Sequence, residues 1–238
     1  MINVRRRSAL QVLEIGRERC RVGAWRGDPT IGYLSPLTRL SPRSVEHATE
    51  VLADGGYRAV ITGAVGGAER TVFAGVGFEE RERLHLLRHI LQDLPAPGPT
   101  PIRRATRRQR ADILDLDRLA FEDFWQLDEA GLDEARQATP ISRFRSVVDD
   151  SRPVGYTVAG RAGSTSYLQR LAVHPDAQGR GYGHDLTVDA LLWARRRRCL
   201  SMMVNTQEIN TAALALYESL GFTRQTHGLY VLERSLEG

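Results

Sequence analysis

Residues 171–184 read LAVHPDAQGRGYGH, and three of the last six are glycine. The apolar residues up to Val173 predict a strand over 166–173, and the sequence from His184 predicts a helix to about residue 198. Glycine permits positive φ and close approach of the backbone to a ligand, and the first amides of a helix have no intrahelical partner. We therefore expect a turn that holds a phosphate or pyrophosphate through backbone N–H groups.

Two common phosphate-binding loops do not fit this stretch. A P-loop requires Gly-Lys-Ser/Thr, and the chain contains no lysine. A Rossmann turn requires the spacing G-x-G-x-x-G and an acidic residue about 20 residues further on. The glycines here follow G-x-G-x-G, and the next predicted strand, which ends at Asn205, has no acid at its tip. What remains is the pattern Gln-x-x-Gly-x-Gly over residues 178–183.

Hydrophobic periodicity around this turn predicts a mixed α/β pattern. The expected strands are 102–104, 144–148, 154–159, 166–173, 200–205 and 229–232, and the expected helices are 110–121, 132–137, 184–198 and 210–220.

A second signature follows downstream, where residues 210–222 fit N-x-x-A-x-x-x-Y-x-x-x-G-F. Both signatures, in this order, resemble those of the GNAT (GCN5-related N-acetyltransferase) family, over roughly residues 101–232. The resemblance implies an α/β (α+β) fold in which a mixed, mostly antiparallel sheet is flanked by helices.

The resemblance also implies acetyl-CoA as the co-substrate and no metal. In this family a primary amine attacks the thioester directly, so the protein need not supply a nucleophile. Tyr217 stands where the family places its general acid, since a neutral phenol can donate a proton to the departing thiolate. The residues that the resemblance assigns to cofactor binding are Leu171, Ala172, Val173, Gln178, Gly179, Arg180, Gly181, Tyr182, Gly183, His184, Asn210, Ala213 and Tyr217.

The general base is less well defined. Many relatives carry a glutamate on the strand before the glycine turn, but this chain has Gln169 there, which cannot accept a proton in that role. Glu122 and Asp123, after the first expected helix, are the candidates, because relatives place substrate-contacting loops at this point. A chain of water molecules is the alternative.

A proline-rich segment at 95–101 divides the chain into an N-terminal part, 1–94, and a catalytic part, 102–238. Gly77-Phe78 matches Gly221-Phe222, and residues 84–87 fall near the place of 229–232, which indicates a weak internal repeat. The first copy lacks the glycine turn. It is expected to be a truncated, degenerate GNAT-like half that does not bind the cofactor in the family manner.

Three functions are open at this stage. The acceptor is expected to be a protein N-terminus or a small amine, since residues 121–132 resemble ribosomal-protein N-acetyltransferases. The tandem arrangement also resembles mycothiol synthases, which acetylate a cysteinyl amine on a small glycoside. The rival from another class is a non-catalytic acyl-CoA sensor module.

Composition limits the partners. All 33 basic side chains are arginine, the net charge is +4, and 29 acidic residues are interspersed with them, so a nucleic-acid partner is not favoured. No run of 18 apolar residues predicts a membrane span. His85 and His89 have a helical zinc-pair spacing but no evident third ligand. Cys20 and Cys199 share no short spacing, which favours reduced thiols in the cytoplasm. The oligomeric state is not predicted.

Overall fold

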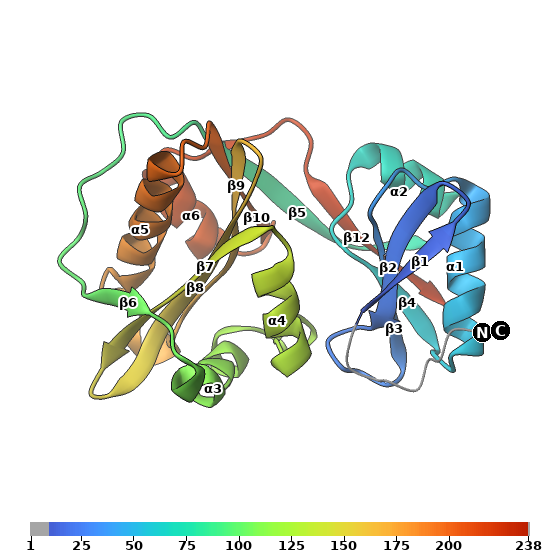
Figure 1. Ribbon diagram of the computed structural model, residues 1–238, viewed down its shortest axis with the longest axis horizontal. Coiled ribbons are helices and arrows are strands. Elements are labelled where there is room, and N and C mark those ends of the chain that lie inside the picture. The colour runs from blue at the N-terminus through green and yellow to red at the C-terminus, as the bar shows by residue number, and fades with distance from the viewer. Residues whose placement is uncertain (1–9, 238) are drawn as a thin grey trace. The chain divides into compact units, whose positions relative to one another are not determined.

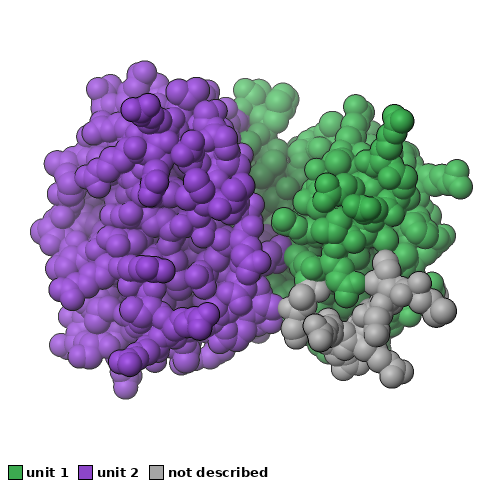
Figure 2. Space-filling model, in the orientation of Figure 1, with its two compact units in different colours: residues 1–86, 207–209, 226–238 green, residues 87–206, 210–225 purple. Residues whose placement is uncertain are grey.

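The computed structural model describes residues 10–237, so the first nine residues of the expected N-terminal half lie outside the description. Contacts group the chain into two compact units (Figure 2). Unit 1 comprises 1–86, 207–209 and 226–238, and unit 2 comprises 87–206 and 210–225. No helix within 10–237 is long and apolar enough to cross a membrane.

Unit 1 is a sheet with two helices (Figure 1). Its strands follow the order β1-β2-β3-β4-β12-β5, and β3 and β4 are parallel because α1 connects them. Leu34, Val45 and Phe73 are among the buried residues of its core. The elements are β1 (Gln11–Ile15), β2 (Glu18–Ala24), β3 (Ile31–Pro36), α1 (Pro42–Asp54), β4 (Ala59–Thr62), α2 (Gly67–Ala74), β12 (Leu229–Ser235) and the first eight residues of β5 (Glu79–His89).

Unit 2 has a sheet of order β10-β9-β8-β7-β6, flanked by helices (Figure 1). One hydrophobic cluster lies under α3 and α4 and includes Tyr156 and Val158. A second lies under α5 and α6 and includes Leu168 and Leu191. The elements are β6 (Ile102–Arg104), η1 (Arg107–Gln109), α3 (Arg110–Ala120), η2 (Asp123–Trp125), α4 (Glu129–Gln137), β7 (Ile141–Asp149), β8 (Arg152–Ala162), β9 (Thr165–Val173), η3 (Pro175–Ala177), α5 (Tyr182–Arg196), β10 (Ser201–Gln207), α6 (Thr211–Ser219) and β11 (Thr223–Arg224).

The internal repeat is visible in the order of the elements. Unit 1 runs through three antiparallel strands, a helix, a strand parallel to the third, and a helix, as do β7 to α6 in unit 2. The glycines after the second helix of each copy, Gly77 and Gly221, both have positive φ, +83° and +86°. The N-terminal region therefore repeats the order of elements from β7 to α6, as the internal repeat predicts.

Some boundaries differ from those predicted. The helix expected from residue 132 begins at Glu129, because Asp128 accepts a hydrogen bond from Gly131 N at 2.7 Å and caps it. β11 was not predicted, since two exposed residues give no periodic signal. The last strand, β12, groups with unit 1, between β4 and β5. The division into domains at 94 and 102 stays a prediction.

Candidate functional site

Strands β9 and β10 are paired over only part of their length. Their parallel register joins Thr165–Tyr167 to Ser201–Met203 and stops there, although β9 continues to Val173 and β10 to Gln207. The remaining part of β9 keeps its other partner, because Leu171 and Val173 pair with β8. The inner edges of the two strands are thereby free to bond an extended ligand between them.

The glycine turn follows directly at the end of β9. Gly179 and Gly181 have φ of +76° and +84°, and nothing lies within 4 Å of a Cβ built at either position. Glycine is therefore required here by backbone conformation, and the space beside each residue is open. The side chain of Gln178 steadies the turn, since its Nε2 donates to Val173 O at 3.3 Å.

Helix α5 begins at this turn without a side-chain cap. Its N-cap is Gly181, so no hydroxyl or carboxylate of the cap residue accepts from the first amides. A Cβ built on Gly183, in the first turn of α5, would lie 3.4 Å from Leu216 Cδ2 on α6. The first turn of α5 therefore packs closely against α6. The uncapped, positively polarised end of α5 and the open glycine turn together form a site for a phosphate or pyrophosphate group.

One carboxylate in this helical turn is held in place by the proline-rich segment. Asp185 is buried, and its Oδ2 accepts hydrogen bonds from the hydroxyl and the backbone N–H of Thr100. His184 Nδ1 lies 3.1 Å from Asp185 Oδ1. Burial raises the pKa of Asp185, but the bonds from Thr100 and His184 outweigh it and leave the pKa below its usual value. The segment therefore compensates for a buried charge at the start of α5.

Helix α6 carries the second signature. Asn210 is its N-cap, and Oδ1 accepts from Ala213 N at 3.0 Å, so the capping role of this asparagine is structural. Tyr217 is buried, with its ring 5.6 Å from that of Phe222. No other residue within 10–237 hydrogen-bonds to its hydroxyl. Burial raises the pKa of Tyr217 well above its usual value, and the charge of Arg170 offsets part of this rise. The phenol is thus held in its protonated form.

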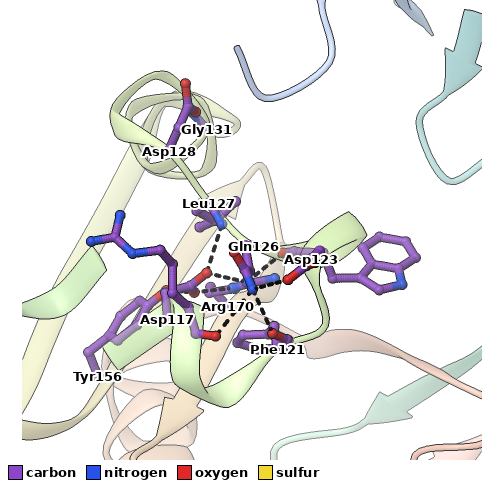
Figure 3. A network of polar contacts seen from close by, with 11 residues as sticks. Asp117, Phe121, Asp123, Gln126, Leu127, Asp128, Gly131, Tyr156 and Arg170 are labelled. Carbon is purple, nitrogen blue, oxygen red and sulfur yellow. Dashed lines mark hydrogen bonds and ion pairs between the residues drawn. The ribbon is translucent and has the colours of Figure 1, made fainter. Parts of the chain in front are cut away.

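The arginine whose charge acts on Tyr217 belongs to a buried ion pair, which Figure 3 shows with its surroundings. Arg170 on β9 bonds both oxygens of Asp117 on α3, at 2.8 and 2.7 Å, and the Asp117 side chain is fully buried. Asp117 also accepts from Tyr156 Oη and from Leu127 N. The carboxylate therefore accepts four hydrogen bonds from three groups, and one of these groups carries the opposite charge.

The same arginine anchors the segment between α3 and α4 (Figure 3). Its Nη2 donates to Trp125 O at 2.7 Å, and its Cζ lies 3.4 Å from the centroid of the Phe121 ring. With the bond from Leu127 N to Asp117, residues 121–127 are fixed at three points. This is the segment in which substrate contacts were expected.

The two candidates for a base lie in this segment, but no contact of theirs reaches the glycine turn or Tyr217. Glu122 is exposed, and Asp123 Oδ1 accepts from Gln126 Nε2 at 2.8 Å. Gln169 is the extra residue of a bulge in β9, where Val158 pairs with Arg170 and Ala159 with Leu168. Its Oε1 is buried without a hydrogen-bond partner in the described part of the chain.

The structure places the predicted residues 171–184 around the end of β9 and the start of α5. The Asp117–Arg170 pair was not identified from the sequence. A signal was available: Asp117 falls on the buried stripe of α3 with Ile113 and Leu116. A carboxylate on an apolar stripe requires a buried cation, and the strand before the glycine turn carries Arg170.

Residues 110–222 match the family model described as the acetyltransferase (GNAT) family. The match runs from the first residue of α3 to Phe222, so it includes the separated strands, the glycine turn and α6. This part of the chain belongs to the GNAT family.

The chain is also similar to curated proteins. The chain is 30% identical over 177 residues to the mycothiol acetyltransferase of Thermobispora bispora, which covers 64% of this chain and 58% of that protein. The chain is 33% identical over 162 residues to the mycothiol acetyltransferase of Thermomonospora curvata, and this match covers 58% of this chain and 50% of that protein. The chain thus spans between half and three fifths of the length of these relatives.

A solved tandem GNAT protein from the clavulanic acid biosynthesis pathway has a TM-score of 0.66 at 15% identity, covering 97% of this chain and 84% of that chain. At this identity the likeness shows the fold. It confirms the predicted GNAT fold with an additional N-terminal GNAT-like half.

Proposed function

We propose that this chain is an acetyl-CoA-dependent N-acetyltransferase that transfers an acetyl group to the primary amine of a small molecule, by direct attack in a ternary complex. The observation that carries the proposal is the separation of β9 from β10 directly beside an uncapped helix start with an open glycine turn. The mycothiol acetyltransferase relatives favour a small-molecule amine over a protein N-terminus as acceptor.

The residues present fit acetyl-CoA. Backbone groups of Leu171 and Val173 would bond the pantetheine arm along the free edge of β9, and the amides of residues 179–183 would hold the pyrophosphate. Positions 179 and 181 leave room for such a group, because even a Cβ there would meet nothing within 4 Å. Acetyl-CoA supplies a thioester whose carbonyl carbon an amine can attack without a protein nucleophile.

Tyr217 is the proposed general acid. Its buried phenol stays protonated and has no hydrogen-bond partner in the described chain, so its proton is available to a departing thiolate. Glu122 is the proposed base, directly or through water, on the segment that Arg170 fixes. A non-catalytic acyl-CoA sensor is the alternative, and it shares every feature of the binding site but needs no proton donor.

We also propose a cytoplasmic setting. Cys20 and Cys199 are both free and buried, and burial raises the pKa of Cys20 to about 11, which makes this thiol a poor nucleophile. Reduced, unpaired cysteines are usual in that compartment.

The cofactor assignment is tested by a pair of glycine substitutions. Gly181→Glu places a carboxylate and a strained backbone in the turn, so acetyl-CoA should no longer raise the melting temperature. Gly163→Glu is the matched control: φ is +59°, nothing lies within 4 Å of a built Cβ, and the residue lies between β8 and β9, away from the turn. It should keep the full shift. Retention of the shift in Gly181→Glu would refute the pyrophosphate assignment.

A further inference from the structure

A cavity in unit 2, separate from the glycine turn, is lined mainly by arginine. Its volume is about 730 Å³, and the rings of Phe144 and Trp193 form part of its wall. None of its lining residues belongs to the glycine turn, to β9 or to α6. Seven of the thirteen lining residues are arginines, namely Arg104, Arg107, Arg110, Arg136, Arg143, Arg145 and Arg197.

Carboxylates neutralise only part of this charge. Glu129 and Asp133 pair with Arg110, and Asp133 also lies 3.5 Å from Arg136. Asp189 is shared by two arginines, at 2.7 Å from Arg143 and 3.5 Å from Arg145. The cavity therefore has fewer acids than bases.

Three lining arginines have no carboxylate within 4 Å in the part of the chain that the structure describes. They come from different segments: Arg104 ends β6, Arg107 begins η1, and Arg197 follows α5. All three are exposed, so they can turn toward a ligand in the cavity. None of the three therefore forms an ion pair with a described carboxylate, although the charge of Arg107 contributes to lowering the pKa of Asp133.

Two further arginines have donors that the protein leaves poorly paired. The Nε of Arg136 is buried and makes no hydrogen bond to any described residue. The Nε of Arg145 is also buried, and the described carboxylate beside it, Asp189 Oδ2, lies 3.5 Å away without hydrogen-bond geometry. Burial, and then the charge of Arg143, lower the pKa of Arg145, so the cations are crowded. Such donors cost free energy unless an acceptor is supplied.

We propose that this cavity binds a small molecule that carries two or more phosphate groups. Guanidinium groups match phosphate oxygens with paired N–H donors, and phosphate brings enough negative charge for several arginines. The volume falls within the range of roughly 300–1,000 Å³ that is usual for small-molecule sites, which favours such a ligand over a nucleic-acid strand. The site is independent of the proposed acetyl transfer.

The test uses inorganic triphosphate as the probe and titration calorimetry of the full chain that carries Gly181→Glu. This substitution is chosen to prevent the glycine turn from competing for the probe, because it adds a carboxylate and a strained backbone there. We expect saturable binding with one triphosphate per chain. Adding Arg107→Ala and Arg197→Ala should weaken it by at least roughly tenfold, because two charge-assisted contacts are lost.

The matched control replaces Arg108 and Arg196 by Ala. Each is the sequence neighbour of a tested arginine, each is exposed, neither lines the cavity, and the loss of charge is identical. This variant should keep its affinity within about twofold, because it removes the same charge without removing a cavity contact. An attraction set by net charge alone would weaken equally in both double variants. Circular dichroism of each variant confirms that the fold is retained.

Three results would overturn the proposal. These are no saturable binding of triphosphate, equal weakening in both double variants, or binding of a single-stranded oligonucleotide that depends on Arg107 and Arg197 while triphosphate does not bind. The last result would make the surface a nucleic-acid site.

Discussion

Arg170 joins the parts of the site through one buried side chain. It neutralises Asp117, holds Trp125 O, stacks on Phe121, and offsets part of the rise in the pKa of Tyr217. Its role is to position residues 121–127 and to contribute positive electrostatic potential at the phenol of Tyr217. It is a positioning residue, and none of its contacts requires it to take part in proton transfer.

Because Asp117 and Arg170 form a buried ion pair, we expect the effects of substitutions at the two positions on the free energy of unfolding to be strongly non-additive. Arg170→Gln leaves a fully buried carboxylate without its cation and should lower the free energy of unfolding by about 3–5 kcal/mol, and Asp117→Asn should cost a similar amount. The double variant Asp117→Asn/Arg170→Gln should cost clearly less than the sum, as measured by urea denaturation at pH 7. Additive costs would show that the two side chains are not coupled.

Tyr217→Phe isolates the phenol. Removing the proposed proton donor should lower kcat by roughly 10–1000-fold and leave the affinity for acetyl-CoA nearly intact, because only the departing thiolate needs the proton. Steady-state kinetics and calorimetry measure the two effects. Tyr167→Phe, an exposed residue near the start of β9, is the control and should retain full turnover. Unchanged kcat in Tyr217→Phe would remove this residue from the mechanism.

At the scale of elements, the start of α5 depends on the proline-rich segment. A Cβ built on Gly98 would lie 1.9 Å from Asp185 Oδ1, so the segment passes directly over this carboxylate. Four prolines between residues 95 and 101 keep the segment extended, which lets Thr100 reach Asp185. The linker was predicted from its prolines, but its attachment to α5 was not.

Thr100→Val should therefore destabilise the protein in a pH-dependent way. The variant keeps the side-chain shape but loses the hydroxyl bond to a buried carboxylate, at a cost of about 1.5–3 kcal/mol at pH 7. Because the folded protein lowers the pKa of Asp185, this stabilisation is present at neutral pH and is lost as the pH falls and the carboxyl becomes protonated.

The control for this prediction is Thr223→Val. Thr223 donates to the neutral carbonyl of Arg88 at 3.2 Å, so its loss should cost less and should not depend on the ionisation of a carboxylate. Chemical denaturation of both variants at pH 7 and at low pH measures the difference. A cost for Thr100→Val that stays constant with pH would contradict the role given to Asp185.

Local signals predicted the elements around the glycine turn and α6 well, for a physical reason. Each of the two signatures, 171–184 and 210–222, is one continuous stretch of sequence. Its strand, turn, cap or helix is therefore encoded by residues that are close neighbours in the chain. Helix α5 began two residues earlier than predicted, because Gly181, and not a residue after the glycines, is the cap. Asp117 and Arg170 are 53 residues apart. The buried stripe of α3 indicates that Asp117 needs a cation, but local periodicity does not identify which arginine supplies it.

The internal repeat is visible in the sequence of the whole chain as a pair of Gly-Phe turns. The segments at 84–87 and 229–232 looked like equivalent positions of two copies, and the structure pairs them directly, with Leu229 opposite Leu84. Which strand lies next to which depends on long-range pairing, whereas periodicity reports only the type of element. For that reason the place of β12, in unit 1, could not be read from the sequence.

The proposed function requires that this chain, whose residues 110–222 match the GNAT family, transfers an acetyl group and does not merely bind its donor. The most direct measurement is the rate of thiol release from acetyl-CoA by the full chain, with a panel of small primary amines that includes cysteinyl amines and with N-terminal peptides as a separate arm. Acetyl transfer should give release that depends on a small amine and yields the N-acetylated product. Binding of acetyl-CoA without amine-dependent release in either arm would contradict it and leave a non-catalytic acyl-CoA sensor.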